Sequence, residues 1–266
     1  MAMRTKPWPN GIPCWADLSV PDVDAAVEFY GRVLGWEFDP TGPDYGGYVL
    51  ATVKGCAAGG IGPLPQPGAP SAWTLYLASD DVDRMAEAIP GLGGSVLLPP
   101  ADVGPLGRMC IAADPSGAVF GVWQAGTHIG AGWVNGAGGL SWEDLRSTDP
   151  DAARAFYGGL FDYRFDLMPD AGPDYTMFTR HDEQAPLGGM GGMMGAPDGT
   201  PSHWLVYFGV EDAKAAVNAA EQSGGGVLMA AFETPYGTMA ALTDPAGAGF
   251  MVVQAHEGAP MPDRAD

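Results

Sequence analysis

The chain has 266 residues, of which 46% are hydrophobic and 17% are charged, so it is long enough to form two compact domains with cores of their own. Its formal net charge of −20 argues against nucleic acids and anionic membranes as partners. The three cysteines form no disulfide framework, the N-terminal segment lacks the apolar run of a secretory signal, and no apolar stretch is long enough to cross a membrane. We therefore expect a cytoplasmic protein.

The first predicted elements are a strand at residues 18–20 and an amphipathic helix at residues 22–35. Asp22 is a suitable N-cap for this helix, and Gly35 ends it. Four apolar residues recur at helical spacing and form one face, namely Val23, Val27, Tyr30 and Leu34. A strand that leads into such a helix appears again at residues 145–147 and 149–161, which indicates a duplication.

The rest of the first half is predicted to contain more strands and a second helix. In chain order we expect a strand-rich segment at 37–61, a loop at 63–70, a strand at 73–78, a helix at 80–89, and strands at 96–98, 107–112 and 119–123. Strand, helix and further strands thus occur once before the loop and once after it. This order predicts two βαβββ units in the first half.

Short motifs of the first half return in the second half at an offset of about 130 residues, as expected for a tandem repeat. They are GPDY at 42–45 and 172–175, GGIG at 59–62 with GGMG at 188–191, PSAW at 70–73 with PSHW at 201–204, and DPSG at 114–117 with DPAG at 244–247. We predict domains at residues 1–128 and 138–266, joined by a linker at 129–137. The fold class is then α+β, with four βαβββ units in two pairs.

The duplicated pattern, in which a strand precedes D-x-x-A-x-x-F-Y-x-x-x-L-G and D-P-x-G precedes the last strand, resembles the vicinal oxygen chelate superfamily. This superfamily includes glyoxalase I, the bleomycin-resistance proteins and the extradiol dioxygenases, and the resemblance covers nearly the whole chain twice. It is closest to the two-domain form often described as hydroxylase-like or glyoxalase-like. The resemblance implies two cup-shaped sheets, with helices outside and a ligand site inside each cup.

In metal-using members of this superfamily, three strand positions hold a divalent ion through His, Gln or Glu. Carried over to this sequence, those positions are Trp15, Trp73 and Gly121 in the first cup, and Trp142, Trp204 and Met251 in the second. None of these side chains is a suitable ligand for such an ion. We therefore expect no metal and no other cofactor.

The four tryptophans at these positions have two possible roles. They either fill the core, as bulky aromatic residues commonly do, or line the cups and stack on an aromatic ligand. Because the superfamily's ligand positions face the cup interior, we favour lining.

Several polar residues are candidates for a site. Strand alternation places Asp17 on the face of Trp15, and Asp144 and Arg146 on the face of Trp142. Either carboxylate is a candidate general acid or base, or else it lies at a rim or pairs with an arginine. Residues considered for ligand contact, with surface or turn roles as the alternative, are His203, Tyr45 and Tyr175.

These features predict a metal-independent protein that binds a hydrophobic, aromatic small molecule of natural-product or xenobiotic type. An enzyme of this kind would transform the ligand by carboxylate acid–base chemistry, as a lyase, isomerase, cyclase or hydroxylase-like tailoring enzyme. The alternatives are a non-catalytic drug-binding resistance protein and a metal-dependent glyoxalase, dioxygenase or hydroxylase. Single-cup relatives dimerise to bring two cups together, whereas this chain contains two cups of its own. A monomer or weak homodimer is therefore expected.

Overall fold

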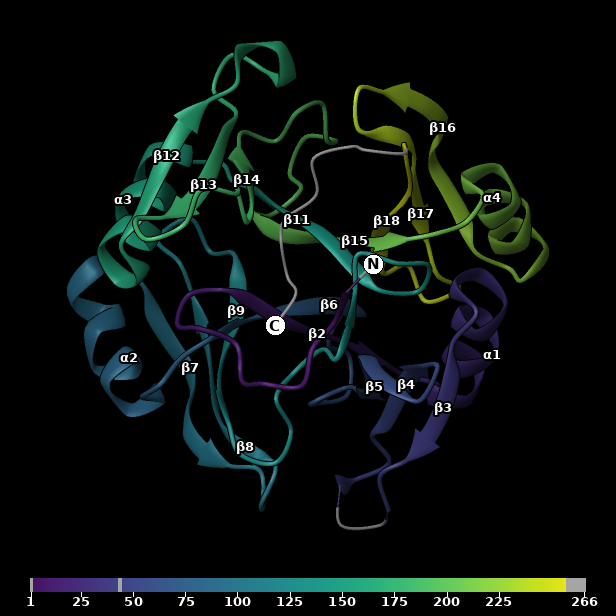
Figure 1. Ribbon diagram of the computed structural model, residues 1–266, viewed down its shortest axis with the longest axis horizontal. Coiled ribbons are helices and arrows are strands. Elements are labelled where there is room, and N and C mark those ends of the chain that lie inside the picture. The colour runs from purple at the N-terminus through teal and green to yellow at the C-terminus, as the bar shows by residue number, and fades with distance from the viewer. Residues whose placement is uncertain (1, 43–44, 257–266) are drawn as a thin grey trace.

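The computed structural model describes residues 2–42 and 45–256. It contains four βαβββ units, arranged as two open, mixed sheets with few helices (Figure 1). Two residues of the first GPDY motif, Pro43 and Asp44, lie outside the described part.

The first half forms a single eight-stranded sheet in the order β3-β4-β5-β2-β6-β9-β8-β7. Its elements are β2 (Pro13–Val20), α1 (Val23–Leu34), β3 (Glu37–Pro40), β4 (Val49–Val53), β5 (Cys56–Pro63), β6 (Ala72–Ala78), α2 (Val82–Ala88), the short helix η2 (Ile89–Leu92), β7 (Ser95–Asp102), β8 (Gly107–Ala113) and β9 (Val119–Ala125).

The second half repeats this order as β12-β13-β14-β11-β15-β18-β17-β16. Its elements are β11 (Leu140–Arg146), α3 (Pro150–Phe161), β12 (Tyr163–Leu167), the short helix η3 (Pro169–Ala171), β13 (Thr176–Arg180), β14 (Gly188–Gly191), β15 (His203–Gly209), α4 (Ala213–Gln222), β16 (Gly226–Thr234), β17 (Gly237–Thr243) and β18 (Gly249–Ala255). Two short strands extend this sheet, because β1 (Ala2–Met3) pairs with β10 (Trp133–Val134), which pairs with β11.

The first helix of each half begins at an aspartate. The side chain of Asp22 accepts a hydrogen bond from the N–H of Ala25, and Asp149 accepts one from Ala152, so each satisfies an N–H group that the helix leaves free. α1 ends at Gly35, which has a φ of 69° and adopts the left-handed conformation that glycine allows. The repeated D-x-x-A pattern is therefore a helix-capping signal.

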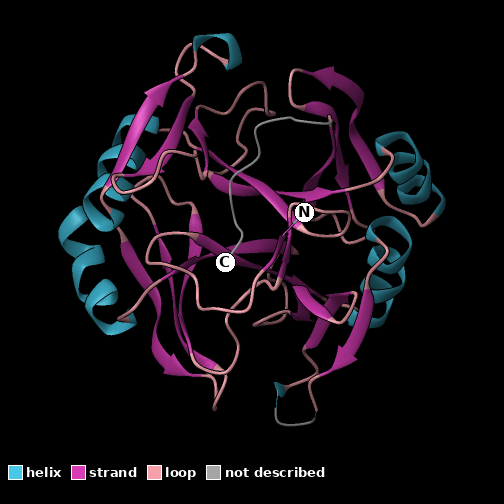
Figure 2. Ribbon diagram, viewed as in Figure 1, coloured by secondary structure: helices cyan, strands magenta, loops and turns pink. Residues whose placement is uncertain are grey.

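The helices lie on two opposite sides of the molecule, with α1 beside α4 and α3 beside α2 and η2 (Figures 1 and 2). Between them, the central strands β6 and β15 bring the two sheets into contact. The rings of Trp73 from β6 and Phe208 from β15 lie 5.0 Å apart, and one buried hydrophobic core runs through both halves. The other face of each sheet is turned away from this core. We call that face cup 1 in the first half and cup 2 in the second.

The two repeated motifs meet across the halves. Tyr30 of the first FY motif donates a hydrogen bond to Asp244 of the second DPxG motif, with 3.3 Å between the oxygens. Reciprocally, Tyr157 lies against Asp114, and burial together with the charge of Asp114 raises the pKa of the Tyr157 hydroxyl well above its usual value. Each tyrosine therefore stays protonated beside a carboxylate of the other half.

Within the described residues, no helix combines the length and the apolar character needed to cross a membrane.

Candidate functional site: two aromatic cups

The strand register shows which tryptophans face the cups. In cup 1, Trp15 lies opposite Tyr76, while Leu18, on the other face of β2, lies opposite Trp73. The prediction that Trp73 lines the cup is therefore wrong. Its ring packs in the core between the halves, 5.4 Å from the ring of Tyr30.

The second half follows the same rule. Trp142 lies opposite Tyr207, and Leu145, on the other face of β11, lies opposite Trp204. Trp204 is buried and its Nε1 donates to the hydroxyl of Tyr157 at 2.9 Å. Trp204 is thus also a core residue, and the prediction that it contacts a ligand is wrong.

Cup 2 has a carboxylate at its floor that accepts four hydrogen bonds. Oδ1 of Asp144 accepts from Nε1 of Trp142 at 2.9 Å and from the hydroxyl of Tyr175 at 2.7 Å. Oδ2 accepts from the hydroxyl of Tyr207 at 2.6 Å and from Nη2 of Arg146 at 2.7 Å. A carboxylate has about four acceptor positions, so Asp144 is saturated. The fold brings Trp142, Tyr175 and Arg146 together around Asp144, and the pairing with Arg146 is the alternative considered for this carboxylate.

Apolar side chains surround this floor and form a cluster separate from the main core. Met251, opposite Tyr207 on β18, belongs to it. The other members are Val253, Trp142, Leu205, Phe232, Met239 and Ala241. His203 lies opposite Arg146 near the rim, where its Nδ1 is 2.9 Å from the carbonyl oxygen of Pro201. Cup 2 therefore combines a polar floor with apolar walls.

Cup 1 has an equivalent floor with looser hydrogen bonds. Nε1 of Trp15 donates to the hydroxyl of Tyr48 at 3.1 Å, and this hydroxyl donates to Oδ2 of Asp17 at 3.5 Å. Burial raises the pKa of Asp17 to about 7, although its interactions with the hydroxyls of Tyr76 and Tyr48 act in the opposite direction. Asp17 therefore changes its protonation state near neutral pH, and it retains room for a further hydrogen bond.

Tyr48, and not Tyr45, is the structural equivalent of Tyr175. Tyr48 immediately precedes β4 and Tyr175 immediately precedes β13, whereas Tyr45 lies in a turn three residues earlier. Tyr48 thus takes the floor position that was expected for Tyr45, and a ligand contact of Tyr45 stays a prediction. Glycines make room for both hydroxyls, since a Cβ at Gly60 or at Gly189 would overlap the phenol of Tyr48 or Tyr175.

The two floors differ in charge. The position that Arg146 takes in β11, two residues after Asp144, is held by Ser19 in β2. In cup 2 burial disfavours the charge of Arg146, but the neighbouring Asp144 more than compensates, so the pKa of the guanidinium is raised. In cup 1 the segment after β9 instead contributes His128, whose ring lies edge-on to Trp15 at 4.6 Å between centroids. Burial lowers the pKa of His128 to about 4, so it is neutral at neutral pH.

Sequence reasoning missed four of these residues: Tyr48, Tyr76, Tyr207 and His128. A signal for two of them was present, because the motif W-x-x-Y occurs at residues 73–76 and again at 204–207. Since the side chains three positions apart on a strand point to opposite faces, a tryptophan in the core implies a tyrosine in the cup.

The residues at the superfamily's metal positions do not fit a divalent ion. The cup faces present Trp15, Tyr76 and Gly121 on adjacent strands of the first half, and Trp142, Tyr207 and Met251 in the second. Indole and protonated phenol groups are not ligands that such ions prefer, and each floor supplies one carboxylate. In the described residues, no three His, Cys, Asp or Glu side chains gather into a possible metal site.

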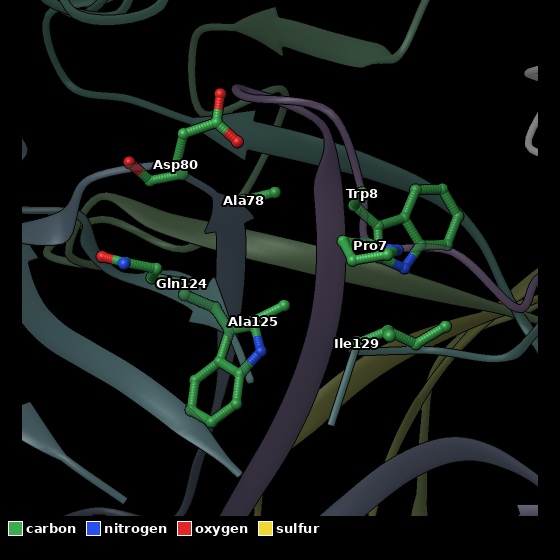
Figure 3. A pocket seen from close by; sticks show the side chains of 9 residues that line it. Pro7, Trp8, Ala78, Asp80, Gln124, Ala125 and Ile129 are labelled. Carbon is green, nitrogen blue, oxygen red and sulfur yellow. The ribbon is translucent and has the colours of Figure 1, made fainter. Parts of the chain in front are cut away.

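Two cavities lie outside the cups, near the junction of the halves. One, of about 250 Å³, lies between the N-terminal segment and the ends of β6 and β9, with Trp8 and Ile129 on one side and Asp80 and Gln124 on the other (Figure 3). Its polar side chains hold the structure together, since Gln124 accepts from the N–H of Val82 and Trp8 donates to the carbonyl of Ala131. The second, of about 330 Å³, adjoins α2 and the end of α3. We assign the chemistry to the cups.

Comparison with known proteins identifies the family that has this fold. The model of the Glyoxalase/Bleomycin resistance protein/Dioxygenase superfamily matches residues 14–122 and again 139–252. The chain belongs to this superfamily. Among curated relatives, CFP32 of Mycobacterium tuberculosis (strain CDC 1551 / Oshkosh), which carries the name of a candidate glyoxylase, is 40% identical over 92% of this chain and 95% of its own length. DnrV of Streptomyces peucetius, named an anthracycline biosynthesis protein, is 36% identical over 94% of this chain and 95% of its own.

Solved structures of the same superfamily share the fold. A Mn(II)-bound glyoxalase from Novosphingobium aromaticivorans aligns with a TM-score of 0.65 and 17% identity, over 93% of this chain and 83% of its own. The 2,3-dioxygenase LapB from Pseudomonas sp. KL28 aligns with a TM-score of 0.65 and 15% identity, over 96% and 95%. At such identities these superfamily members establish the architecture of the two cups and nothing about their chemistry.

Proposed function

We propose that this protein binds a fused-ring aromatic small molecule in its cups and transfers a proton to or from it, with Asp17 as the general acid or base. The observation that carries this proposal is the carboxyl group of Asp17. It lies between Trp15, Tyr48 and Tyr76, at a floor where relatives that use metals place their ligands, and its pKa is raised to about 7. A general acid or base is most effective when its pKa is close to the working pH.

The walls support an aromatic ligand. Leu98 of β7 and Met229 of β16 are 41% and 52% exposed, and their strand partners Ile111 and Ala241 lie on the cup faces. Exposed apolar side chains inside a concavity favour apolar ligands, and the half-buried indole of Trp142 offers a stacking surface. The relationship to DnrV fits this choice, since anthracyclines are fused-ring aromatic compounds.

The simplest reaction of this kind is a keto–enol isomerisation. The ionised carboxylate of Asp17 takes a proton from a ring carbon whose anion is conjugated with a ring carbonyl, and the C–H electron pair forms the enolate. The protonated Asp17 then returns its proton to the carbonyl oxygen, which completes the isomerisation without an oxidant or reductant. The hydroxyls of Tyr48 and Tyr76 stay protonated, because burial raises the pKa of both well above the usual value. Each hydroxyl has one proton, which it shares with Asp17 while that group is ionised and donates to the oxygen that gains charge once Asp17 carries the proton.

Asp144 is the less suitable base, because its four acceptor positions are already occupied. In this proposal it holds the floor of cup 2 in place. The two aspartates therefore provide a matched pair of isosteric variants, Asp17→Asn and Asp144→Asn, for separating chemistry from structure.

The test uses anthrone in D₂O without oxygen, with exchange of its acidic C–H for C–D followed by NMR. We expect the protein to accelerate exchange, with a rate that rises as the pH passes through about 7 and levels off above it. Asp17→Asn should reduce the rate to the uncatalysed value, while Asp144→Asn keeps most of it. Equal rates for wild type and Asp17→Asn at every pH would refute Asp17 as the base.

The same experiment distinguishes the alternatives. Quenching of tryptophan fluorescence by anthrone without any catalysed exchange would favour a binding protein of the drug-resistance type. Exchange that requires one equivalent of a divalent metal, measured by elemental analysis of the purified protein, would favour a metal-dependent enzyme instead.

A further inference from the structure

The guanidinium of Arg146 lies at the floor of cup 2 with donors still available. Its side chain is 13% exposed, and Nη2 is held at 2.7 Å from Oδ2 of Asp144. The hydroxyl of Tyr207, 3.5 Å from the same nitrogen, helps to fix its position. An arginine has five N–H groups, and Nη2 uses its two on Asp144 and Tyr207, so those of Nη1 and Nε are left for other partners.

The neighbouring acceptor, in contrast, is used up. Both oxygens of Asp144 already accept two hydrogen bonds each. The hydroxyls of Tyr175 and Tyr207 point to this carboxylate, and the pKa of each is raised by burial first and then by the charge of Asp144. A ligand that reaches the floor of cup 2 therefore meets free N–H donors and no free carboxylate acceptor.

The present partner of the outer guanidinium nitrogen is a weak one. Nη1 of Arg146 contacts the thioether sulfur of Met194, in the segment between β14 and β15. A thioether is a poor hydrogen-bond acceptor, and Met194 is 48% exposed on an unbranched, flexible side chain. An oxygen acceptor would make a stronger, charge-assisted hydrogen bond at this position.

Cup 1 lacks this feature. Ser19 holds the position equivalent to Arg146, and His128, the basic residue beside Trp15, is neutral because burial lowers its pKa to about 4. One chain thus contains two aromatic floors of the same design, of which one presents a cation to its ligand. The difference provides an internal control.

We propose that cup 2 is a receptor for an aryl ketone or quinone, whose ring carbonyl oxygen displaces the thioether of Met194 and accepts a hydrogen bond from Arg146. The rings lie against the apolar walls formed by Met239, Met251 and Phe232. A neutral carbonyl suffices as the acceptor, because Asp144 already balances the charge of Arg146 and no further anion is needed. This inference rests on the proposed function, in that it requires the cups to bind aromatic molecules, and it gives cup 2 a specificity of its own.

The test compares 9-fluorenone with fluorene, two rings of the same shape that differ in one carbonyl. Binding is followed by NMR of protein with ¹³C-labelled methionine methyl groups. Met239, Met251 and Met194 report on cup 2 and Met109, opposite Trp123, reports on cup 1. Single Met→Leu variants assign the signals.

We expect fluorenone to shift the cup 2 signals, that of Met194 most, with an affinity at least tenfold higher than that of fluorene. At Met109 the two compounds should differ less than threefold. Arg146→Met should abolish the preference at cup 2, while Arg146→Lys keeps part of it. The spectra of the free variants show whether they are folded, and the comparison at Met109 in the wild type stands even if Arg146→Met is not.

Equal affinity of both compounds at cup 2 of the wild type, or an unchanged preference in a folded Arg146→Met variant, would overturn this inference and leave aromatic binding intact. A failure of both compounds to shift any cup signal would contradict the aromatic-ligand proposal as well.

Discussion

The hydroxyl of Tyr30 donates to Oδ2 of Asp244 at 3.3 Å, although 214 residues of chain separate the two. The other oxygen of Asp244 accepts from the N–H groups of Ala246 and Ala248 and so fixes the turn before β18. The FY and DPxG motifs are therefore two sides of one contact. Because each half supplies both motifs, two such contacts join the halves.

Tyr30→Phe should reduce the free energy of unfolding by about 1–2 kcal/mol, because the buried oxygen of Asp244 loses its donor. Tyr157→Phe should cost about 1–3 kcal/mol, since Nε1 of Trp204 then lacks its buried acceptor. Urea denaturation measures both. Tyr236→Phe, in the turn between β16 and β17, is the control and should change the value by less than about 0.5 kcal/mol.

Asp17 makes stability depend on pH in a defined direction. Its pKa is 3.8 in the unfolded reference and about 7 in the fold, so the folded state binds the proton more tightly. The stabilisation is complete below about pH 4 and is lost as the pH rises through about 7. Asp17→Asn avoids this loss and should gain about 1–3 kcal/mol relative to wild type between pH 4 and pH 8, a range that allows for the partial exposure of Asp17.

Denaturation of both proteins at several pH values measures this difference. Asp144→Asn is the matched comparison, and it should lose about 3 kcal/mol because the charge of Arg146 is left without its partner. A constant difference between wild type and Asp17→Asn from pH 4 to pH 8 would contradict the assignment.

Gly189→Ala should disturb the floor of cup 2, because the added Cβ would overlap the hydroxyl of Tyr175. We expect a loss of about 1–3 kcal/mol in the free energy of unfolding and a weaker affinity for aromatic ligands in cup 2. Gly91→Ala is the control, since nothing lies within 4 Å of its added Cβ. A crystal structure of Gly189→Ala with Tyr175 still on Asp144 would show the prediction to be mistaken.

Trp204→Ala should mainly reduce stability, whereas Trp142→Ala should mainly reduce the affinity for aromatic ligands. Trp204 is buried in the core, so its removal should cost about 3–5 kcal/mol while leaving cup 2 able to bind. Trp142 is half-buried on the cup face, so its removal should cost less stability and most of the aromatic affinity. Denaturation and fluorenone titration below 15 °C measure the two quantities separately. If Trp204→Ala abolished binding in folded protein, the assignment of faces would be incorrect.

The fold was predictable because its signals are local and occur twice. Caps, apolar periodicity and DPxG turns depend on residues a few positions apart, and duplication repeats each of them. The family model that matches both halves agrees with this interpretation. The register of Asp17, Asp144 and Arg146 was equally accessible, because strand alternation fixes which residues share a face.

The remaining site residues depend on pairings that one sequence does not contain. Trp73 and Trp204 were expected on the cup face but lie on the core face of the sheet. A shift of one residue in the assumed strand register moves every side chain to the other face. Tyr48 was missed because three residues separate the first GPDY motif from β4, whereas the second GPDY motif ends directly before β13. The role of His128 depends on the path of the segment after β9 beside Trp15, which no periodicity predicts.

The single core that runs through both halves has a consequence for how such a molecule changes. The floor of cup 2 has an apolar cluster of its own, whereas Trp15 and Tyr76 of cup 1 belong to the core that runs through both halves. A substitution such as Ser19→Arg would then give cup 1 the cation of cup 2 without changing the fold. A duplicated protein of this form can evolve affinity for a second ligand in one cup while the other cup keeps its original ligand.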